Sequence, residues 1–250
     1  MRTFRADLHV HTVLSPCAEV EMIPPLIVQA ALEHHIDIIA ITDHNASANV
    51  PAVQKAADGT GLIVLPGMEV QTHEDVHLLC LFASLPDLES WQHKVDLSLP
   101  DTLNQPEHFG EQYIVDENGE YIRTETRLLL TATEFSIEEV IQQVNELGGL
   151  VIPAHVDRKS FGLFPTLGFL ADWWNFPALE ISRHITAETL QEKFPSSKNH
   201  PLIQSGDVHR LNEFLGTTHF EIEAPTLDEI AKAFCGENQR IVRINSSKID

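Results

Sequence analysis

Two histidines separated by one residue stand near the N-terminus, in the stretch RADLHVHTVLSP, residues 5–16. The apolar run around them predicts a buried strand, in which alternate side chains point to the same face. Asp7, His9 and His11 are therefore expected on one face. Imidazoles and carboxylates are unfavourable to bury unless they form hydrogen bonds or hold a metal ion. An isolated pair more often forms structural hydrogen bonds, so the rest of the chain has to distinguish the two interpretations.

The same residue types recur at the ends of later apolar runs. They are Asp43 and His44 in ITDHN, Glu69 in PGMEV, His77 in VHLLCLF, His155 in IPAHVDR, and Asp207 and His209 in SGDVHR. The C-terminal ends of parallel strands are where α/β folds place their active sites. One such histidine is weak evidence, but nearly every strand end here holds His, Asp or Glu. Mixed imidazole and carboxylate groups without thiolate suit Zn, Mn or Fe.

Strands and helices are expected to alternate along the chain, which indicates a parallel α/β fold. Strands are predicted over 4–10, 36–42, 62–70, 76–82, 150–154, 178–182, 202–205, 220–222 and 241–244, and helices over 24–35, 136–149 and 226–236. The second helix begins with a capping box of Ser136 and Glu139, and Thr226 and Glu229 repeat the design in the third. We expect one domain over residues 1–250.

Residues 84–135 interrupt this alternation. They contain scattered prolines and then a predicted hairpin around Asn118-Gly119. Long excursions between barrel elements are usually functional. We expect this insertion to border the site as a partial lid that admits small substrates, the alternative being a segment packed on the outside.

The composition favours a cation-binding protein. The formal charge is -21, and the chain has 14 His against 16 Lys and Arg. This charge opposes binding to long nucleic acid or to an anionic membrane surface. Cys17, Cys80 and Cys235 are too few and too widely spaced for a disulfide framework. No apolar run is long enough to cross a membrane, and a cytoplasmic location is expected.

The motifs DLHVHT, ITDHN, PGMEV, IPAH and SGDVH resemble, in this order, those of the PHP (polymerase and histidinol phosphatase) family, from about residue 3 to about residue 212. That family includes histidinol phosphatases, small nucleotide phosphatases, an RNA exonuclease and a domain of bacterial replicative DNA polymerases. The resemblance implies a distorted (β/α)7 TIM-like barrel with a trinuclear metal site at its C-terminal face.

The resemblance also implies a ligand set for three divalent ions. His9, His11, Glu69 and Asp207 would hold one ion; Glu69, His77 and His155 a second; and His44 and His209 the third with one further residue. The family usually supplies that residue shortly after the second histidine, where this chain reads SPCAEVEM. We expect Glu21, because it lies next to the helix start at Pro24, with Glu19 as the second choice and Cys17 as the third.

The expected function is a metal-dependent phosphoesterase that hydrolyses a small phosphomonoester, nucleotide-like or histidinol-phosphate-like, by attack of a metal-bound hydroxide. Asp207, His209 and Arg158 are the predicted catalytic residues, with Arg158 gripping the phosphate. Weaker candidates for that contact are Arg183, His184 and Arg210. Asp7 and Asp43 are expected to orient imidazoles. Glu180 either faces the barrel mouth or forms a structural salt bridge.

Two alternatives stay open at this stage. One is a non-catalytic metal-binding module, and the other is an exonuclease acting on short oligonucleotides. Almost all the expected ligands are present and no polymerase sequence follows, so the enzyme interpretation is preferred.

Overall fold

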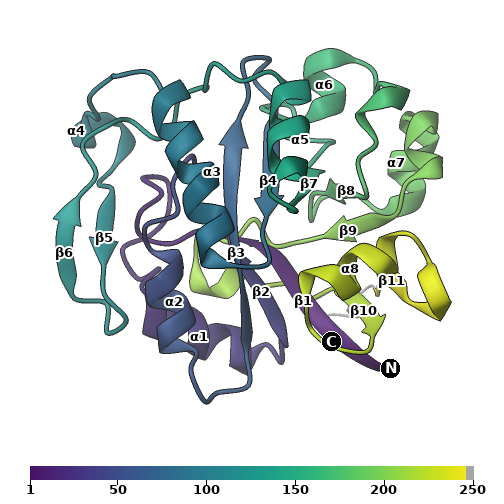
Figure 1. Ribbon diagram of the computed structural model, residues 1–250, viewed down its shortest axis with the longest axis horizontal. Coiled ribbons are helices and arrows are strands. Elements are labelled where there is room, and N and C mark those ends of the chain that lie inside the picture. The colour runs from purple at the N-terminus through teal and green to yellow at the C-terminus, as the bar shows by residue number, and fades with distance from the viewer. Residues whose placement is uncertain (246–250) are drawn as a thin grey trace.

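The computed structural model describes residues 1–245, whose main sheet curls into a half barrel (Figure 1). The order of its seven strands is β11-β10-β1-β2-β3-β4-β7. Their bounds are β1 Arg2–Val10, β2 Ile38–Ile41, β3 Ile63–Gln71, β4 His77–Leu81, β7 Leu150–Pro153, β10 Thr218–Ile222 and β11 Ile241–Ile244. The strand positions predicted from the apolar runs are confirmed, with ends that differ by up to two residues.

The strand directions differ from the all-parallel prediction. β1, β2 and β3 are parallel, but β4 is antiparallel to β3 and to β7, and β10 is antiparallel to β1 and to β11. Only residues 72–76 separate β3 from β4, which is too short for the crossover that parallel neighbours need. β4 therefore begins at the edge where β3 ends, and this places His77 beside Glu69 although His77 starts its strand.

A parallel pair, β8 (Leu179–Ile181) and β9 (Leu202–Gln204), closes the open side of the half barrel. The Val156 amide donates to the Glu180 carbonyl at 2.9 Å, which links β7 to β8. A bridge between Val10 and Val208 joins the end of β1 to the segment after β9. The distorted barrel predicted from the resemblance is confirmed.

The two faces of the sheet form separate apolar clusters. Residues such as Ile39 and Leu78 pack against helices α1, α2, α3 and α5, whereas Ile38 and Leu79 belong to a second cluster that α8 covers. The bounds of the helices are α1 Pro24–Glu33, α2 Val50–Ala56, α3 Leu85–Ser98, α4 Pro106–Phe109, α5 Ile137–Glu146, α6 Leu163–Leu167, α7 Ala187–Lys193 and α8 Leu227–Phe234, with short 3-10 helices η1 Asp172–Trp174, η2 Pro195–Asn199, η3 Leu211–Glu213 and η4 Glu237–Gln239. None of the helices within residues 1–245 combines the length and the apolar character needed to span a bilayer.

The capping predictions hold for one of the two helices. Ser136 and Glu139 form the expected capping box at the start of α5. Thr226 caps α8, but the Glu229 side chain accepts hydrogen bonds from Arg240 and from the Glu223 amide instead of from the Thr226 amide. Glu229 thereby ties α8 to the start of β11.

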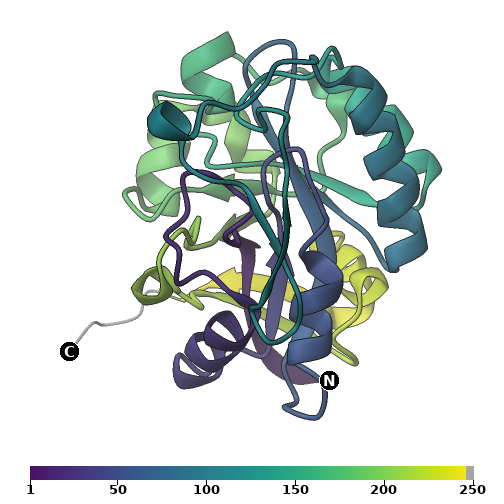
Figure 2. The ribbon, with the colours of Figure 1, turned by 90° about the vertical axis from the view of Figure 1, so that its left-hand side faces the viewer.

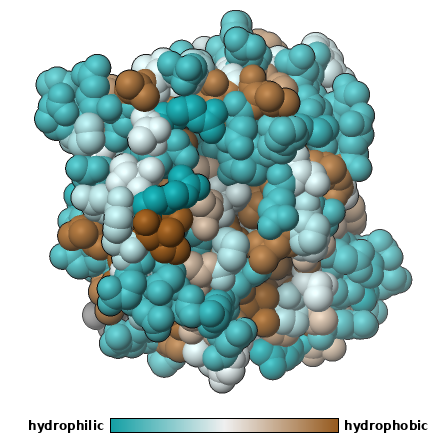
Figure 3. Space-filling view, turned by 60° about the vertical axis from the view of Figure 1, so that its left-hand side comes forward, coloured by the Kyte–Doolittle hydropathy of each residue, from teal (hydrophilic) through white to brown (hydrophobic). Residues whose placement is uncertain are grey.

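The insertion braces the loops that follow β1 and β2. Its hairpin, β5 (Tyr113–Val115) and β6 (Tyr121–Thr124), turns at Asn118-Gly119 as predicted and faces the viewer in Figure 2. The Tyr113 amide donates to the Val13 carbonyl at 3.1 Å, and Asn49 Nδ2 donates to the Tyr113 carbonyl at 3.0 Å. In Figure 1 the hairpin lies across the molecule from β8 and β9. Hydrophilic residues cover most of the face in Figure 3, with hydrophobic residues in small groups. The role as a lid stays a prediction.

The ion pair between Glu229 and Arg240 predicts that the stability of the protein depends on pH. Hydrogen bonds from Arg240 lower the pKa of Glu229 from 4.5 to about 2. A carboxyl group whose pKa is lower in the folded than in the unfolded protein stabilises the folded state at any pH above its unfolded pKa. This stabilisation is lost as the pH falls through the pKa of the folded state. Glu229→Gln should therefore lower the free energy of unfolding at about pH 7, and the difference from the wild type should shrink between about pH 4.5 and about pH 2. Urea unfolding of both metal-free proteins measures it; a difference that stays constant down to about pH 2 would contradict the assignment.

Candidate metal centre

A β-bulge in β1 turns its two histidines toward the barrel interior. Asp7 pairs with Ile39, and Val10 pairs with Ile41, so β1 advances three residues while β2 advances two. The extra residue shifts the alternation of side chains. His9 and His11 consequently reach Glu69, whereas Asp7 accepts hydrogen bonds from the amides of Gly206 and Leu215 at 2.9 Å each. The prediction that Asp7 shares the face of the histidines is wrong for this reason.

The Glu69 carboxylate stands at the centre of the site. It is 1% exposed and contacts five imidazoles, at distances of 2.8 Å to His77 Nδ1, 3.0 Å to His44 Nδ1, 3.2 Å to His155 Nε2, and 3.3 Å to both His9 Nε2 and His11 Nε2. Burial raises the pKa of Glu69, but the charges of the surrounding imidazoles outweigh burial and hold this pKa well below its ordinary value. The carboxylate therefore stays ionised.

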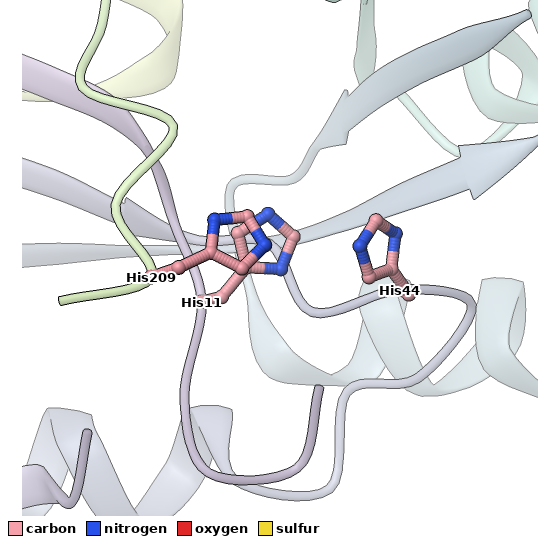
Figure 4. Close-up of side chains that lie close together, drawn as sticks. All are labelled: His11, His44 and His209. Carbon is pink, nitrogen blue, oxygen red and sulfur yellow. The ribbon is translucent and has the colours of Figure 1, made fainter. Parts of the chain in front are cut away.

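Asp207 and His209 approach the same cluster from the segment after β9. Asp207 Oδ1 is 3.4 Å from His9 Nε2 and 3.5 Å from His11 Nε2. The ring of His11 lies between those of His44 and His209, with centroid distances of 4.6 and 4.1 Å (Figure 4). Residues separated by some two hundred positions in the chain thus meet at one point, as the strand-end pattern predicts.

Hydrogen bonds from groups outside the cluster determine which ring nitrogen of His9 and of His11 faces the site. Glu180 Oε2 accepts from His9 Nδ1 and from the His155 amide, both at 2.9 Å. Ser15 Oγ donates to Asp43 Oδ1 at 2.7 Å and so accepts from His11 Nδ1 at 2.9 Å. These bonds place a proton on Nδ1 of each ring, so Nε2 is the atom that His9 and His11 each turn to the site, and the two Nε2 atoms face each other 3.1 Å apart. Asp43 thus orients His11 through Ser15, and Glu180 orients His9.

Two residues of the site have backbone conformations that side chains rarely adopt. His155 has φ 30° and Asp207 has φ 49°, both in the left-handed region. Such strain persists where the surrounding structure holds it, and it is frequent at functional sites. At Asp207 the amide of the preceding Gly206 is fixed by Asp7, which gives the buried Asp7 carboxylate its positioning role.

The donor atoms fit divalent cations. Within residues 1–245, three sets of side chains have ligand atoms within 4.8 Å of one another: His9, His11 and Glu69; His44, Glu69 and His77; and His11, His44 and His209. Three buried atoms of the cluster, Glu69 Oε2, His77 Nε2 and His155 Nδ1, have no hydrogen-bond partner. Orphaned buried polar atoms are rare and indicate an ion or a water that they would contact. Converging bare nitrogens around an ionised carboxylate are therefore typical of a metal centre.

Two of the imidazoles are held neutral, the form that metal ligation requires. Burial, more than any other effect, lowers the pKa of His77 to about 4 and that of His209 to about 3. Neighbouring charged histidines lower both values further, and the carboxylates of Glu69 and Asp207 offset only part of the effect. Burial lowers the pKa of His9, His11 and His44 as well, but neighbouring anionic groups outweigh burial and raise it, so an ion would displace a proton from these three rings.

The segment 15–22 does not bring Glu21 to the cluster. Glu21 is exposed, and its carboxylate forms no hydrogen bond or ion pair with the described residues. Its neighbour Met22 is buried in the core, which turns Glu21 outward. Glu19 is paired with Arg210 at 2.6 Å, whereas Cys17 Sγ lies 3.1 Å from His209 Nε2. The expected preference for Glu21 over Cys17 is corrected on this point.

A cavity of about 520 Å³ opens beside the cluster. Arg158, Asp207 and His209 line it together, so the three predicted catalytic residues face one space. The guanidinium of Arg158 donates to Asp207 Oδ2. Arg183 also lines the cavity, but it donates to the carbonyls of Gly206 and Glu213, which fixes the loop that carries Asp207. The remaining lining residues are Cys17, His155, Glu180, Ile181, Ser182, His184, Ser205, Gly206, Arg210 and Glu213.

Sequence reasoning missed two residues that shape the site. Ser15 connects Asp43 to His11, and the ring of Phe161 stacks on His77 with centroids 4.4 Å apart. Phe161 reaches this position through a left-handed backbone conformation with φ 61°. Neither a lone serine nor a phenylalanine with a rare φ leaves a signal in the sequence.

The half barrel brings together a buried cluster of histidines and carboxylates that could hold divalent ions. The chain belongs to the PHP domain family, whose model matches residues 7–146. It is 32% identical over 80 residues to the 5'-3' exoribonuclease Rnm of Salmonella typhimurium, a match that covers 30% of this chain and 26% of the relative.

Solved structures show the same fold. The lesion-specific endonuclease Q of Pyrococcus furiosus superposes with a TM-score of 0.73 at 20% identity, covering 96% of this chain and 58% of that one. A protein of Bifidobacterium adolescentis assigned as a metal-dependent phosphoesterase superposes with a TM-score of 0.58 at 18% identity, covering 93% and 96%. The match thus spans only about a quarter of the exoribonuclease and under three fifths of the endonuclease.

Glu69→Gln should be the most damaging single change in the site. It removes the one negative charge that five imidazoles share, and we expect the loss of at least two bound ions after reconstitution with Zn²⁺ or Mn²⁺. Elemental analysis measures the ions per chain, and Glu89→Gln on the exposed face of α3 serves as the control. Unchanged metal content in Glu69→Gln would show that Glu69 is not a ligand.

Proposed function

We propose that this protein is a metal-dependent phosphoesterase that hydrolyses a small phosphomonoester at the cavity beside the histidine cluster. The observation that carries the proposal is the meeting of two features: buried, bare imidazole nitrogens around Glu69, and an adjoining cavity into which Arg158 projects. A structural zinc site would have a closed set of ligands, whereas this cluster borders an open cavity.

The proposed ligands are those that the resemblance implies. His9, His11, Glu69 and Asp207 hold one ion, and Glu69, His77 and His155 a second, while His44 and His209 contribute to a third. Bound divalent ions supply Lewis acidity toward a phosphate and lower the pKa of a coordinated water. Glu180 and Asp43 keep the Nδ1 protons of His9 and His11 in place, so that the Nε2 atoms stay available.

Arg158 is the proposed phosphate-binding residue. Its side chain is 42% exposed and is paired with Asp207, which is itself a proposed ligand. Asp207 would hold an ion through the oxygen that faces His9 and His11, and the remaining donors of the Arg158 guanidinium would suit two oxygens of a phosphate. Arg210 is a weaker choice because Glu19 and Glu213 already engage it.

A second candidate function is an exonuclease on short oligonucleotide ends. A further cavity of about 300 Å³ shares His184 with the first and is lined by Thr186, Thr189 and Lys193, which provides room for a second nucleotide. Similar proteins include an exoribonuclease and an endonuclease. The argument against long nucleic acid thus depends on the charge of -21 alone.

Chelation and a substrate panel test the proposal. The protein reconstituted with Zn²⁺ or Mn²⁺ should release phosphate from an aryl phosphate, a nucleoside monophosphate or histidinol phosphate, and chelator should abolish the activity. Release of mononucleotides from a short oligonucleotide, with no activity on the small esters, would favour the second candidate. Hydrolysis that persists after complete metal removal would refute both.

Arg158→Ala should raise KM more than it lowers kcat. A hydrogen bond to a charged group contributes about 1.5–3 kcal/mol, which corresponds to about a 10- to 100-fold rise in KM if the ground and transition states are gripped equally. Arg123→Ala on the exposed hairpin strand β6 is the matched control. Unchanged kinetics in Arg158→Ala would remove Arg158 from the site.

A further inference from the structure

We infer that the thiolate of Cys17 is a ligand of the third ion, together with His44 and His209, so that this ion is bound by sulfur as well as nitrogen. The inference rests on the proposed function, because it assumes that the cluster holds metal. It assigns to Cys17 a position that the resemblance reserves for an acid or a histidine, and it predicts a metal preference for this chain.

The contact between Cys17 and His209 has the orientation of two ligands of one ion. His209 Nδ1 lies 2.9 Å from the carbonyl of Asp207, and a carbonyl can only accept, so Nδ1 donates and Nε2 is the atom that remains for a ligand. The bare Nε2 atom then points at Cys17 Sγ, 3.1 Å away. His44 and His209 have ligand atoms within 4.8 Å of each other, so the sulfur lies next to one member of a pair that could share an ion.

The backbone builds this contact. The Glu19 amide donates to the His209 carbonyl at 2.9 Å, and the Ala18 amide donates to the Ser15 carbonyl at 2.9 Å, which closes a turn around Cys17. The insertion supports the same turn, because Gly110 packs so tightly on the Pro16 carbonyl that a Cβ atom would lie 2.1 Å from its oxygen. The backbone of the turn that carries Cys17 is therefore held from both sides.

The alternatives in the segment are engaged elsewhere. Glu19 is paired with Arg210, and Glu21 points to solvent beside the buried Met22. Two cysteines remain as internal controls. Cys80 is fully buried in β4, where its thiol donates to the Leu78 carbonyl, and Cys235 is exposed just after α8.

A sulfur ligand changes which ion the third position selects. Thiolate favours Zn²⁺ and other borderline or soft ions, whereas carboxylate and water favour Mg²⁺ and Mn²⁺. With Cys17 the third ion should be Zn²⁺ when Zn²⁺ and Mn²⁺ are offered together, and Cys17→Asp should move that preference toward Mn²⁺.

Spectroscopy of the metal-loaded full chain tests the inference without depending on activity. The Co²⁺-substituted wild type should show a sulfur-to-cobalt charge-transfer band in the near ultraviolet, and X-ray absorption of the Zn²⁺ form should show sulfur at about 2.3 Å. Both signals should disappear in Cys17→Ser and persist in Cys235→Ser and in Glu21→Gln. Circular dichroism checks that each variant is folded.

The outcomes separate this inference from the proposed function. Full metal content with no sulfur signal in the wild type, or a signal that survives in Cys17→Ser, would overturn the role of Cys17 and leave the phosphoesterase proposal standing. A folded wild type that binds no divalent ion after reconstitution would overturn both.

Discussion

The negative charge of Glu69, buried among five imidazoles, is the interaction on which the site depends. A carboxylate in such a place is stable only if positive charge surrounds it. The chain meets this requirement by ending or starting β1, β2, β4 and β7 with histidines that reach the same point. The barrel can thus be understood as the device that brings histidines from distant strands within about 3 Å of one carboxylate.

A second layer of polar groups makes the arrangement rigid. Glu180 holds His9 and the backbone of His155, and Asp43 acts on His11 through Ser15. Asp7 holds the amide of Gly206 just before Asp207. Each of these carboxylates is buried and accepts hydrogen bonds from the groups that it holds, which is how a fold fixes ring tautomers without adding further ligands. A few of the 37 acidic residues thus orient imidazoles or the loop that carries Asp207, whereas most of the others are not buried.

The histidines of the site could be predicted from the sequence because strand ends converge in α/β folds whatever the details of pairing. The direction of the Asp7 side chain could not be predicted from the sequence. One extra residue in β1 reverses the alternation of side chains, and no residue type in DLHVHT indicates a bulge. His77 lies at the predicted edge although it starts its strand, because the short connection of residues 72–76 reverses the direction of β4 relative to β3. The choice among Cys17, Glu19 and Glu21 depended on backbone hydrogen bonds to His209, which are tertiary contacts that local spacing does not contain.

The end of β1 and the segment after β9 are joined by the bridge between Val10 and Val208, which we call the seam of the barrel. This seam has a consequence for how the protein folds and binds metal. The two sides of the seam lie at opposite ends of the chain, and bringing them together is a contact of large sequence separation, which forms slowly in folding. His9 and His11 stand on one side and Asp207 and His209 on the other. An ion held by residues on both sides would bind the closed barrel in preference to the open chain. By mass action, such an ion would stabilise the contact between the two sides. Metal supply would then influence how much of the protein persists in its closed form as well as its chemistry.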